Sequence, residues 1–288
     1  MVPPILIEGE TRVGKELFAR AIHNELPRSG SFVPINCGAM SRELMASELF
    51  GYEKGAFTGA DRSSAGKIEV ADCGTLCLDE IGELPPGMQP YLLRVLDDGI
   101  VYRIGSHQEK RVAIGLVSMT NRNLANEVEK GTFRQDLFYR IATLRLRVPP
   151  LRERGDDVLL IAEQLCRTLA MQRGTTPVSL SSEAQDCLSH YHWPGNVREL
   201  RNVLEMSMLM ASGKCIEWHD LPEEVRMNQE APSATNRLYT STSDLRTTEE
   251  LLIKETIARQ GGNLTQAAKQ LGIARSTLYS RLAKEAKR

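Results

Sequence analysis

The chain has 288 residues, of which 41% are apolar, 25% charged and 5% aromatic, with 36 Lys and Arg against 37 Asp and Glu. This composition is that of a soluble globular protein with room for two or three domains. No apolar run approaches the roughly 18 to 20 residues that span a bilayer, and the first residues lack the charged start of a secretion signal. We therefore expect neither a membrane protein nor a secreted one.

The N-terminal half alternates strand-like and helical segments. Short runs rich in β-branched residues predict strands at 5–7, 32–36, 75–78, 115–118 and 143–148. Helical spacing of apolar residues predicts helices at 16–26, 88–97, 124–130 and 134–141. This alternation is typical of a largely parallel sheet with crossover helices. From 151 to 224 the pattern is helical only, which predicts a second, all-helical subdomain.

The rest of the chain differs in composition. Residues 229–247 are rich in Ser and Thr and show no periodicity, so we expect a flexible linker. Residues 248–288 carry eight basic and four acidic side chains, a net charge of +4, which leaves about −5 for the remainder. The six cysteines lack the paired spacing of a zinc site, and we expect reduced core thiols. They are Cys37, Cys73, Cys77, Cys166, Cys187 and Cys215.

A phosphate-binding pattern follows the first predicted strand. The spacing G-x-x-x-x-G-K opens directly onto a helix, where backbone N–H groups and the Lys ammonium can surround phosphates. Two positions depart from the usual pattern, an acidic residue in place of the Ser or Thr that touches magnesium, and an Arg where such loops often have Gly. The nucleotide-binding residues expected here are Gly9, Glu10, Thr11, Arg12, Val13, Gly14, Lys15 and Glu16.

Two carboxylates end the third predicted strand. Asp79 would hold magnesium through water, and Glu80 would polarise the attacking water, as in a Walker B motif. Two acids at the end of a strand are often only a solvated turn. Together with the phosphate loop, they predict an ATPase that uses ATP and magnesium.

Three segments carry a family resemblance. Residues 48–60, 74–81 and 193–200 closely resemble the signatures of the bacterial sigma-54-dependent transcriptional activators, which are AAA+ ATPases also called enhancer-binding proteins. The resemblance implies that a small-residue loop, otherwise interpretable as a flexible turn, contacts sigma-54 with Phe57 and Thr58 at its tip and moves with nucleotide state. The loop comprises Gly55, Ala56, Phe57, Thr58, Gly59 and Ala60.

The resemblance also implies further roles within the ATPase. Asn36 matches the residue that hydrogen-bonds the Walker B glutamate, and Asn121 matches the sensor I residue near the γ-phosphate. Arg134 and Arg140 resemble arginine fingers that act on a neighbouring subunit. Arg198 matches sensor II, which reaches the same phosphate from the helical lid.

Other positions differ from the family. Gly115 replaces an Arg, Ser118-Met119 replaces two small residues, and only four residues precede Ile5, where the family has residues that help to hold adenine. We therefore expect an ATPase subdomain that is shortened at its N-terminus relative to the family.

The basic end predicts a DNA-binding unit. Helical segments at 248–260, 265–271 and 274–284, separated by glycine-containing breaks, have the spacing of a helix-turn-helix. A solvated basic bundle is the alternative from composition, but the segment also resembles the Fis-type domain that ends this family. The candidate DNA contacts are Arg275, Ser276, Thr277, Tyr279, Ser280 and Arg281.

The expected fold is thus α/β, an AAA+ P-loop parallel sheet with a helical lid and a C-terminal all-α helix-turn-helix domain. The expected boundaries are 1–150 for the α/β part, 151–228 for the lid, 229–247 for the linker and 248–288 for the DNA-binding domain. The resemblance implies a cytoplasmic, nucleoid-associated bacterial activator that binds double-stranded DNA upstream of promoters. It would assemble from a dimer to a hexamer and remodel sigma-54 RNA polymerase. A DNA-binding regulator with impaired ATPase activity, or a ring ATPase that acts on another protein, remain alternatives.

Overall fold

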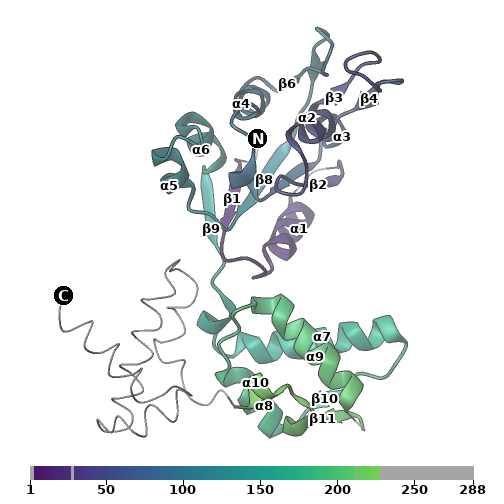
Figure 1. The fold of residues 1–288 in the computed structure, drawn as a ribbon, viewed down its shortest axis with the longest axis vertical. Coiled ribbons are helices and arrows are strands. Elements are labelled where there is room, and N and C mark those ends of the chain that lie inside the picture. Colours follow the sequence, from purple (N-terminus) through teal and green to yellow (C-terminus); the bar gives the residue numbers. More distant parts are fainter. Residues whose placement is uncertain (1–2, 27–28, 212, 228–288) are drawn as a thin grey trace, which may run out of the picture. The chain divides into compact units, whose positions relative to one another are not determined.

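A computed structural model describes residues 3–26, 29–211 and 213–227 (Figure 1). The chain divides into two compact units, Met1–Arg226 and Met227–Arg288. The predicted linker and helix-turn-helix, with the candidate DNA contacts from Arg275 to Arg281, lie outside the described residues. None of the helices within the described ranges is long and apolar enough to cross a membrane.

A parallel sheet of five strands organises the α/β part. The strand order is β2-β5-β8-β1-β9, and every pairing is parallel, which confirms the predicted sheet. Asn36 pairs with Asp79 and Glu8 pairs with Thr120, so the carboxyl ends of neighbouring strands meet at one edge. The strands are β1 (Ile5–Glu8), β2 (Phe32–Asn36), β5 (Thr75–Asp79), β8 (Gly115–Thr120) and β9 (Leu144–Arg147).

Helices cover both faces of this sheet because successive side chains of its central strands point to opposite faces, and both sets are apolar. Ile7 and Val117 face a cluster that includes Ala19 of α1 (Lys15–Glu25). Leu6 and Leu76 belong to the larger cluster on the other face. That cluster is built with α2 (Arg42–Phe50), α3 (Lys67–Val70), α4 (Gln89–Asp98), α5 (Leu124–Glu129) and α6 (Gln135–Ile141).

In the α/β part, the structure adds helices and hairpins that the sequence did not predict. α2 and α3 are two of them. Two short antiparallel hairpins are the others, β3 (Gly51–Tyr52) with β4 (Ser64–Ala65), and β6 (Ile100–Val101) with β7 (Lys110–Arg111). The four predicted helices in this part are present, although Arg134 occupies the N-cap position of α6 rather than lying inside the helix.

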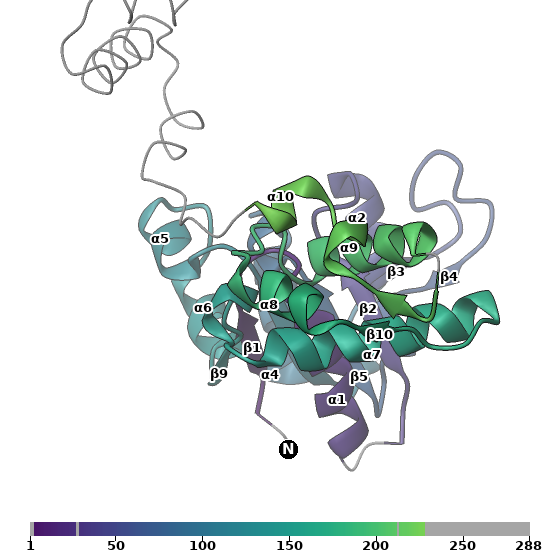
Figure 2. The same cartoon turned by 90° about the horizontal axis from the view of Figure 1, so that it is seen from below.

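The lid region is mainly helical, as Figure 2 shows from a second direction. Its core surrounds Trp193, which is fully buried and donates from Nε1 to the Leu188 carbonyl at 2.8 Å. The expectation of helices alone was incomplete, because β10 (Ser179–Leu180) and β11 (Cys215–Ile216) form a parallel pair. The lid helices are α7 (Asp157–Arg173), α8 (Ser182–His190), α9 (Asn196–Met210) and α10 (Glu223–Arg226), with 3-10 turns at Leu151–Glu153 and Trp218–Asp220. A further 3-10 turn, Ile81–Glu83, follows β5 in the α/β part.

All six cysteines are free thiols. Cys37, Cys77 and Cys166 are buried, and burial raises the pKa of the Cys37 and Cys77 thiols to about 12. The prediction of core thiols is wrong for Cys73, which is exposed in a turn with a left-handed backbone.

Candidate nucleotide site

The phosphate loop joins β1 to α1, and the side chain of Lys15 binds the backbone of this loop. The Lys15 ammonium donates to the carbonyls of Gly9 at 3.0 Å and Glu10 at 2.9 Å. Burial lowers the pKa of Lys15, while the charges of Glu80 and Asp79 act in the opposite direction. The site therefore brings a buried ammonium close to the two predicted carboxylates.

Backbone conformation explains two loop positions. Gly14 has a φ of 98°, in the left-handed region that favours glycine. A Cβ at Gly9 would lie 2.6 Å from the Val148 carbonyl oxygen, so a side chain would collide with the main chain there. Arg12 adopts a φ of 68° without being glycine, at a cost of about 1–2 kcal/mol. Arg12 therefore occupies a left-handed position that glycine would adopt without this cost.

Asp79 and Glu80 lie at the carboxyl end of β5. Burial raises the pKa of Asp79, and the Glu80 N–H, which donates to its Oδ1 at 3.0 Å, lowers it. The Asn36 amide donates to Asp79 at 3.3 Å. The expectation that Asn36 bonds the glutamate is therefore corrected, because the register of β2 against β5 places Asn36 directly opposite Asp79.

A polar cavity of roughly 680 Å³ lies beside these carboxylates and is lined by Asn36, Glu80 and Asn121, among others. Asn121 follows β8 and donates to the Thr11 hydroxyl at 2.8 Å, which ties the strand end to the phosphate loop. Three predicted residues from different strands thus meet in one cavity. Such crevices outside the carboxyl ends of parallel strands are where α/β proteins bind ligands.

The lid holds the outer side of the phosphate loop through residues that the sequence did not single out. Asn196 is buried, accepts from the Leu151 N–H at 2.8 Å and donates to Glu10 at 3.2 Å and to the Thr11 carbonyl at 3.3 Å. Arg152 binds both oxygens of Glu10, at 2.5 and 2.9 Å, and this bond lowers the Glu10 pKa. The only sequence signal is the position of Asn196 within the segment 193–200.

The three predicted arginines lie outside the set of residues that lines this cavity. The guanidinium of Arg134 binds Asp136 at 3.0 and 2.6 Å, and Arg140 forms an ion pair with Asp97 at 3.0 Å. Arg198 lies in the first turn of α9 and is exposed. Within one chain, then, Arg134 and Arg140 contact carboxylates of α6 and α4.

The loop from Gly55 to Ala60 lies between β3 and β4. It is closed by the Gly55 N–H, which donates to the Ala60 carbonyl at 2.9 Å, and Phe57 is 46% exposed. Its neighbour Thr58 is also exposed. The ring of Phe57 lies 5.0 Å from that of Tyr52, measured between centroids. The loop therefore presents an aromatic side chain and a hydroxyl to solvent.

Charged side chains fix the base of this loop. Arg103, which follows β6, binds Glu69 of α3 at 2.7 and 2.8 Å and Glu53 at 3.0 Å. Lys110 also binds Glu69. The Glu53 N–H donates to the Ile104 carbonyl at 3.0 Å. These contacts join the two hairpins to each other and to the helix before β5.

The comparisons with known proteins agree with this geometry. The sigma-54 interaction domain matches residues 2–147, which is half of the chain. The chain belongs to the sigma-54 interaction domain family. In addition, the AAA+ ATPase lid domain matches residues 152–238, and the Fis family of bacterial regulatory proteins matches residues 244–284.

Three similar proteins are each longer than this chain. It is 44% identical over 96% of its length to a protein named limonene hydroxylase from Geobacillus stearothermophilus, covering 51% of that protein. It is 41% identical over 97% of its length to the transcriptional regulatory protein ZraR of Salmonella typhimurium, covering 63%. The crystal structure of NtrX from Brucella abortus with ADP has a TM-score of 0.71 and 33% identity, over 98% of this chain and 64% of NtrX. The chain thus spans half to under two thirds of these proteins.

Proposed function

We propose that this chain is an ATP-driven transcriptional activator. It binds DNA upstream of promoters through residues 248–288, assembles into a ring in the bacterial cytoplasm, beside the nucleoid, and uses ATP hydrolysis to remodel the closed complex of sigma-54 RNA polymerase. The observation that carries the proposal is the joint presence of a formed phosphate loop with two carboxylates and an exposed Phe57 and Thr58 in the family's loop. The domain boundaries expected from the sequence form part of this proposal.

The residues of the nucleotide cavity have distinct proposed tasks. Lys15 exchanges its two loop carbonyls for β- and γ-phosphate oxygens. Glu80 takes a proton from the attacking water, and Asn121 orients that water. Arg134 leaves Asp136 to contact the nucleotide of a neighbouring subunit, where its guanidinium stabilises transition-state charge.

Arg140 and Arg198 complete the proposed phosphate contacts. Arg140 acts from the neighbouring subunit in the same way as Arg134, and Arg198 reaches the phosphate from the lid.

The donor set also fits magnesium. Within the described part of the chain, no three His, Cys, Asp or Glu side chains gather into a metal site of their own. Magnesium keeps several waters and takes phosphate oxygens with one or two carboxylates, and Asp79 supplies such a carboxylate. When bound, the ion would neutralise the charge of the β- and γ-phosphates.

The decisive experiment separates work on polymerase from chemistry at phosphate. Thr58→Ala removes one exposed hydroxyl and should leave basal ATP hydrolysis within about two- to three-fold, because neither Thr58 nor Phe57 can supply a base or a phosphate ligand. Open-complex formation at a sigma-54 promoter should be lost while DNA binding is retained. Full transcription by the Thr58→Ala variant would contradict the proposal. If the unsubstituted chain hydrolyses no ATP, the result would instead favour a DNA-binding regulator that does not use hydrolysis.

A further inference from the structure

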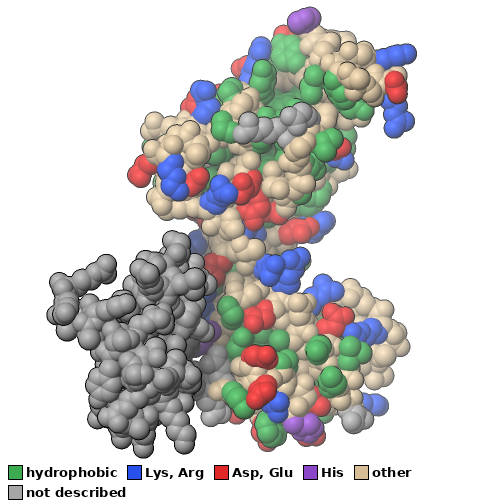
Figure 3. All heavy atoms as spheres, in the orientation of Figure 1, with side chains coloured by type: hydrophobic (Ala, Val, Ile, Leu, Met, Phe, Trp, Pro, Cys, Tyr) green, Lys and Arg blue, Asp and Glu red, His purple; other side chains and the backbone are tan. Residues whose placement is uncertain are grey.

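A second, mainly apolar cavity lies away from the nucleotide site, between α2, α4 and the hairpin β6–β7. Its volume is roughly 890 Å³, within the range of about 300–1,000 Å³ that small-molecule pockets occupy. On the face in Figure 3, hydrophobic side chains gather over α4 and this hairpin. None of its lining residues belongs to the cavity of Asn36 and Glu80.

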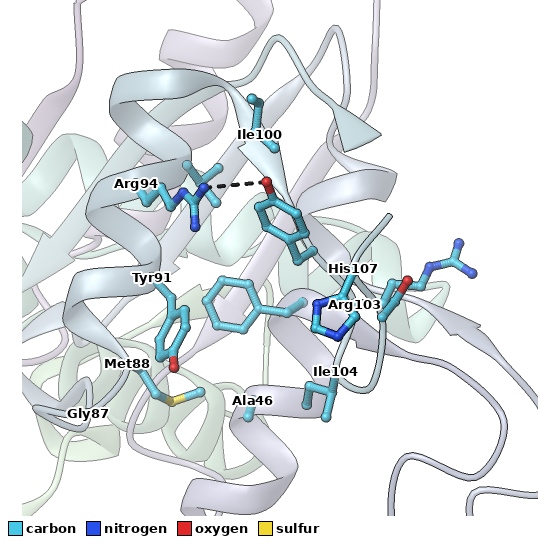
Figure 4. A pocket seen from close by; sticks show the side chains of 13 residues that line it. Ala46, Gly87, Met88, Tyr91, Arg94, Ile100, Arg103, Ile104 and His107 are labelled. Atoms are coloured by element: carbon cyan, nitrogen blue, oxygen red, sulfur yellow. Dashed lines mark hydrogen bonds between the residues drawn. The ribbon is translucent and has the colours of Figure 1, made fainter. Parts of the chain in front are cut away.

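Aromatic groups dominate the wall. Phe50 and Met88 are buried, and the rings of Phe50 and Tyr91 meet edge to face with centroids 6.0 Å apart. Figure 4 shows Met88, Tyr91 and His107 around one space. Rings at these orientations suit a flat aromatic guest, which would gain both apolar burial and edge-to-face contacts.

One cationic group at the rim makes only long contacts to oxygen atoms, and its guanidinium also lies over the Tyr102 ring, 4.9 Å from the ring centroid. The Arg94 guanidinium donates to the Tyr102 hydroxyl at 3.4 Å and lies 3.6 Å from Asp98, both long distances, whereas Arg103 makes bonds of 2.7 to 3.0 Å to its carboxylates. The Tyr102 hydroxyl in turn donates to Glu109 at 2.6 Å. An anion entering the cavity would therefore find its best partner in Arg94, which can form a paired hydrogen bond with a carboxylate.

We propose that this cavity binds an amphipathic aromatic anion, a small molecule of one or two rings with a single carboxylate or sulfonate, whose rings lie between Phe50, Met88 and Tyr91 and whose anionic group binds Arg94. Phe50 directly precedes β3, and Ile104 of the cavity wall is hydrogen-bonded to Gly51 and Glu53 at the base of the Gly55–Ala60 loop. A bound molecule thus stabilises the arrangement that joins the two hairpins. Binding of such a molecule does not depend on the proposed function. Only an effect of that binding on transcription rests on the proposed function.

Two fluorescent probes with the same ring skeleton test the proposal. 8-Anilinonaphthalene-1-sulfonate carries the anion, and N-phenyl-1-naphthylamine lacks it. Titrated into the full chain, the sulfonate should bind at one site and more tightly than the amine. Arg94→Gln should weaken sulfonate binding about tenfold or more and leave amine binding within about twofold, because it removes only the charge-assisted bond. Asp98→Asn should strengthen sulfonate binding several-fold, since it removes the competing carboxylate.

Two further variants locate the site. Ala46→Trp should fill the cavity and abolish binding of both probes, whereas Leu209→Ser on the exposed face of α9 should leave it unchanged. Equal sulfonate binding by Ala46→Trp and the unsubstituted chain, or equal weakening of both probes by Arg94→Gln, would overturn the proposal. A third result would also overturn the proposal, namely that Ala46→Trp changes the sedimentation coefficient of the chain but leaves probe binding unchanged. The cavity would then be a contact between copies of the chain rather than a ligand site. If the probes bind as expected but transcription is unaffected, binding stands and the link to the loop fails.

Discussion

Asn196 offers the most quantitative test of how the lid holds the phosphate loop. The residue is 1% exposed, its φ is 52°, and its side-chain oxygen accepts a hydrogen bond from the buried Leu151 N–H. Replacing it with Ala leaves that N–H unpaired, at about 1–3 kcal/mol. A left-handed Ala costs about 1 kcal/mol more than Asn, which tolerates this conformation. Asn196→Ala should therefore destabilise the ATPase unit by about 2–4 kcal/mol.

The matched variant Asn196→Gly separates the two contributions. Glycine adopts the left-handed backbone freely but cannot bond Leu151, so it should keep the hydrogen-bond loss and be about 1 kcal/mol more stable than the Ala variant. Asn196→Asp keeps the acceptor for Leu151 and places a second carboxylate against Glu10, from which Asn196 is 3.2 Å away. Its defect should therefore include weaker ATP binding through the phosphate loop, in addition to the stability lost by burying a second carboxylate beside Glu10.

Thermal unfolding and nucleotide titration measure these effects. For a unit of this size about 1 kcal/mol corresponds to 2–4 °C, so the Ala variant should melt roughly 4–16 °C lower. A shift below about 1 °C, or an identical shift for Ala and Gly, would refute the assigned hydrogen bond and backbone cost. Unchanged ATP affinity in the Asp variant would show that the Asn196 contact does not control the loop.

Three other predictions concern hydrolysis and its coupling. Glu80→Gln should retain ATP binding and lose hydrolysis by about 10² or more, the usual effect of removing a positioned base; turnover near the unsubstituted rate would remove Glu80 from the mechanism. Arg134→Ala subunits mixed with Lys15→Ala subunits should recover part of the ATPase activity, because a mixed ring contains intact interfaces, and no recovery is expected if Arg134 acts within its own subunit. Arg103→Gln should release the loop base and reduce sigma-54 binding more than ATP hydrolysis, and a parallel loss of both would contradict a coupling role.

Periodicity was sufficient to predict the main sheet. All five strands overlap the runs that predicted them. For the central strands β1, β5 and β8 this follows because a buried parallel strand needs a nearly continuous apolar run. The edge strand β9 is exposed along its length and alternates Leu and Arg, so burial does not explain its prediction. The phosphate loop and the two carboxylates were also predictable, since each directly follows such a strand. The hairpins escaped prediction because strands of two residues, such as β3 and β6, are too short to show an alternating pattern.

Helix α2 was missed for a different reason. Its apolar residues do not form one stripe, because Leu44 is 59% exposed while Met45 and Leu49 are fully buried. The signal that was available is its cap, since Ser41 accepts from the Leu44 N–H at 3.4 Å. The contacts of Asn196 with Glu10 and of Asn36 with Asp79 join distant parts of the chain, so only the register of the folded elements determines them.

The ion pairs at the base of the Gly55–Ala60 loop have a role that stability alone does not explain. Exposed pairs contribute only about 0–1 kcal/mol, and burying a pair brings a desolvation cost that can cancel its attraction. Yet Arg103 and Glu69 have side chains only 16% and 10% exposed, and one guanidinium binds two carboxylates from different segments. A Lys could not form this fork, because its ammonium is a single point charge. The arrangement therefore fixes orientation, so that the loop base, the second hairpin and the helix preceding β5 keep one geometry. The helix held in this way, α3, is followed directly in the chain by β5, which ends in Asp79.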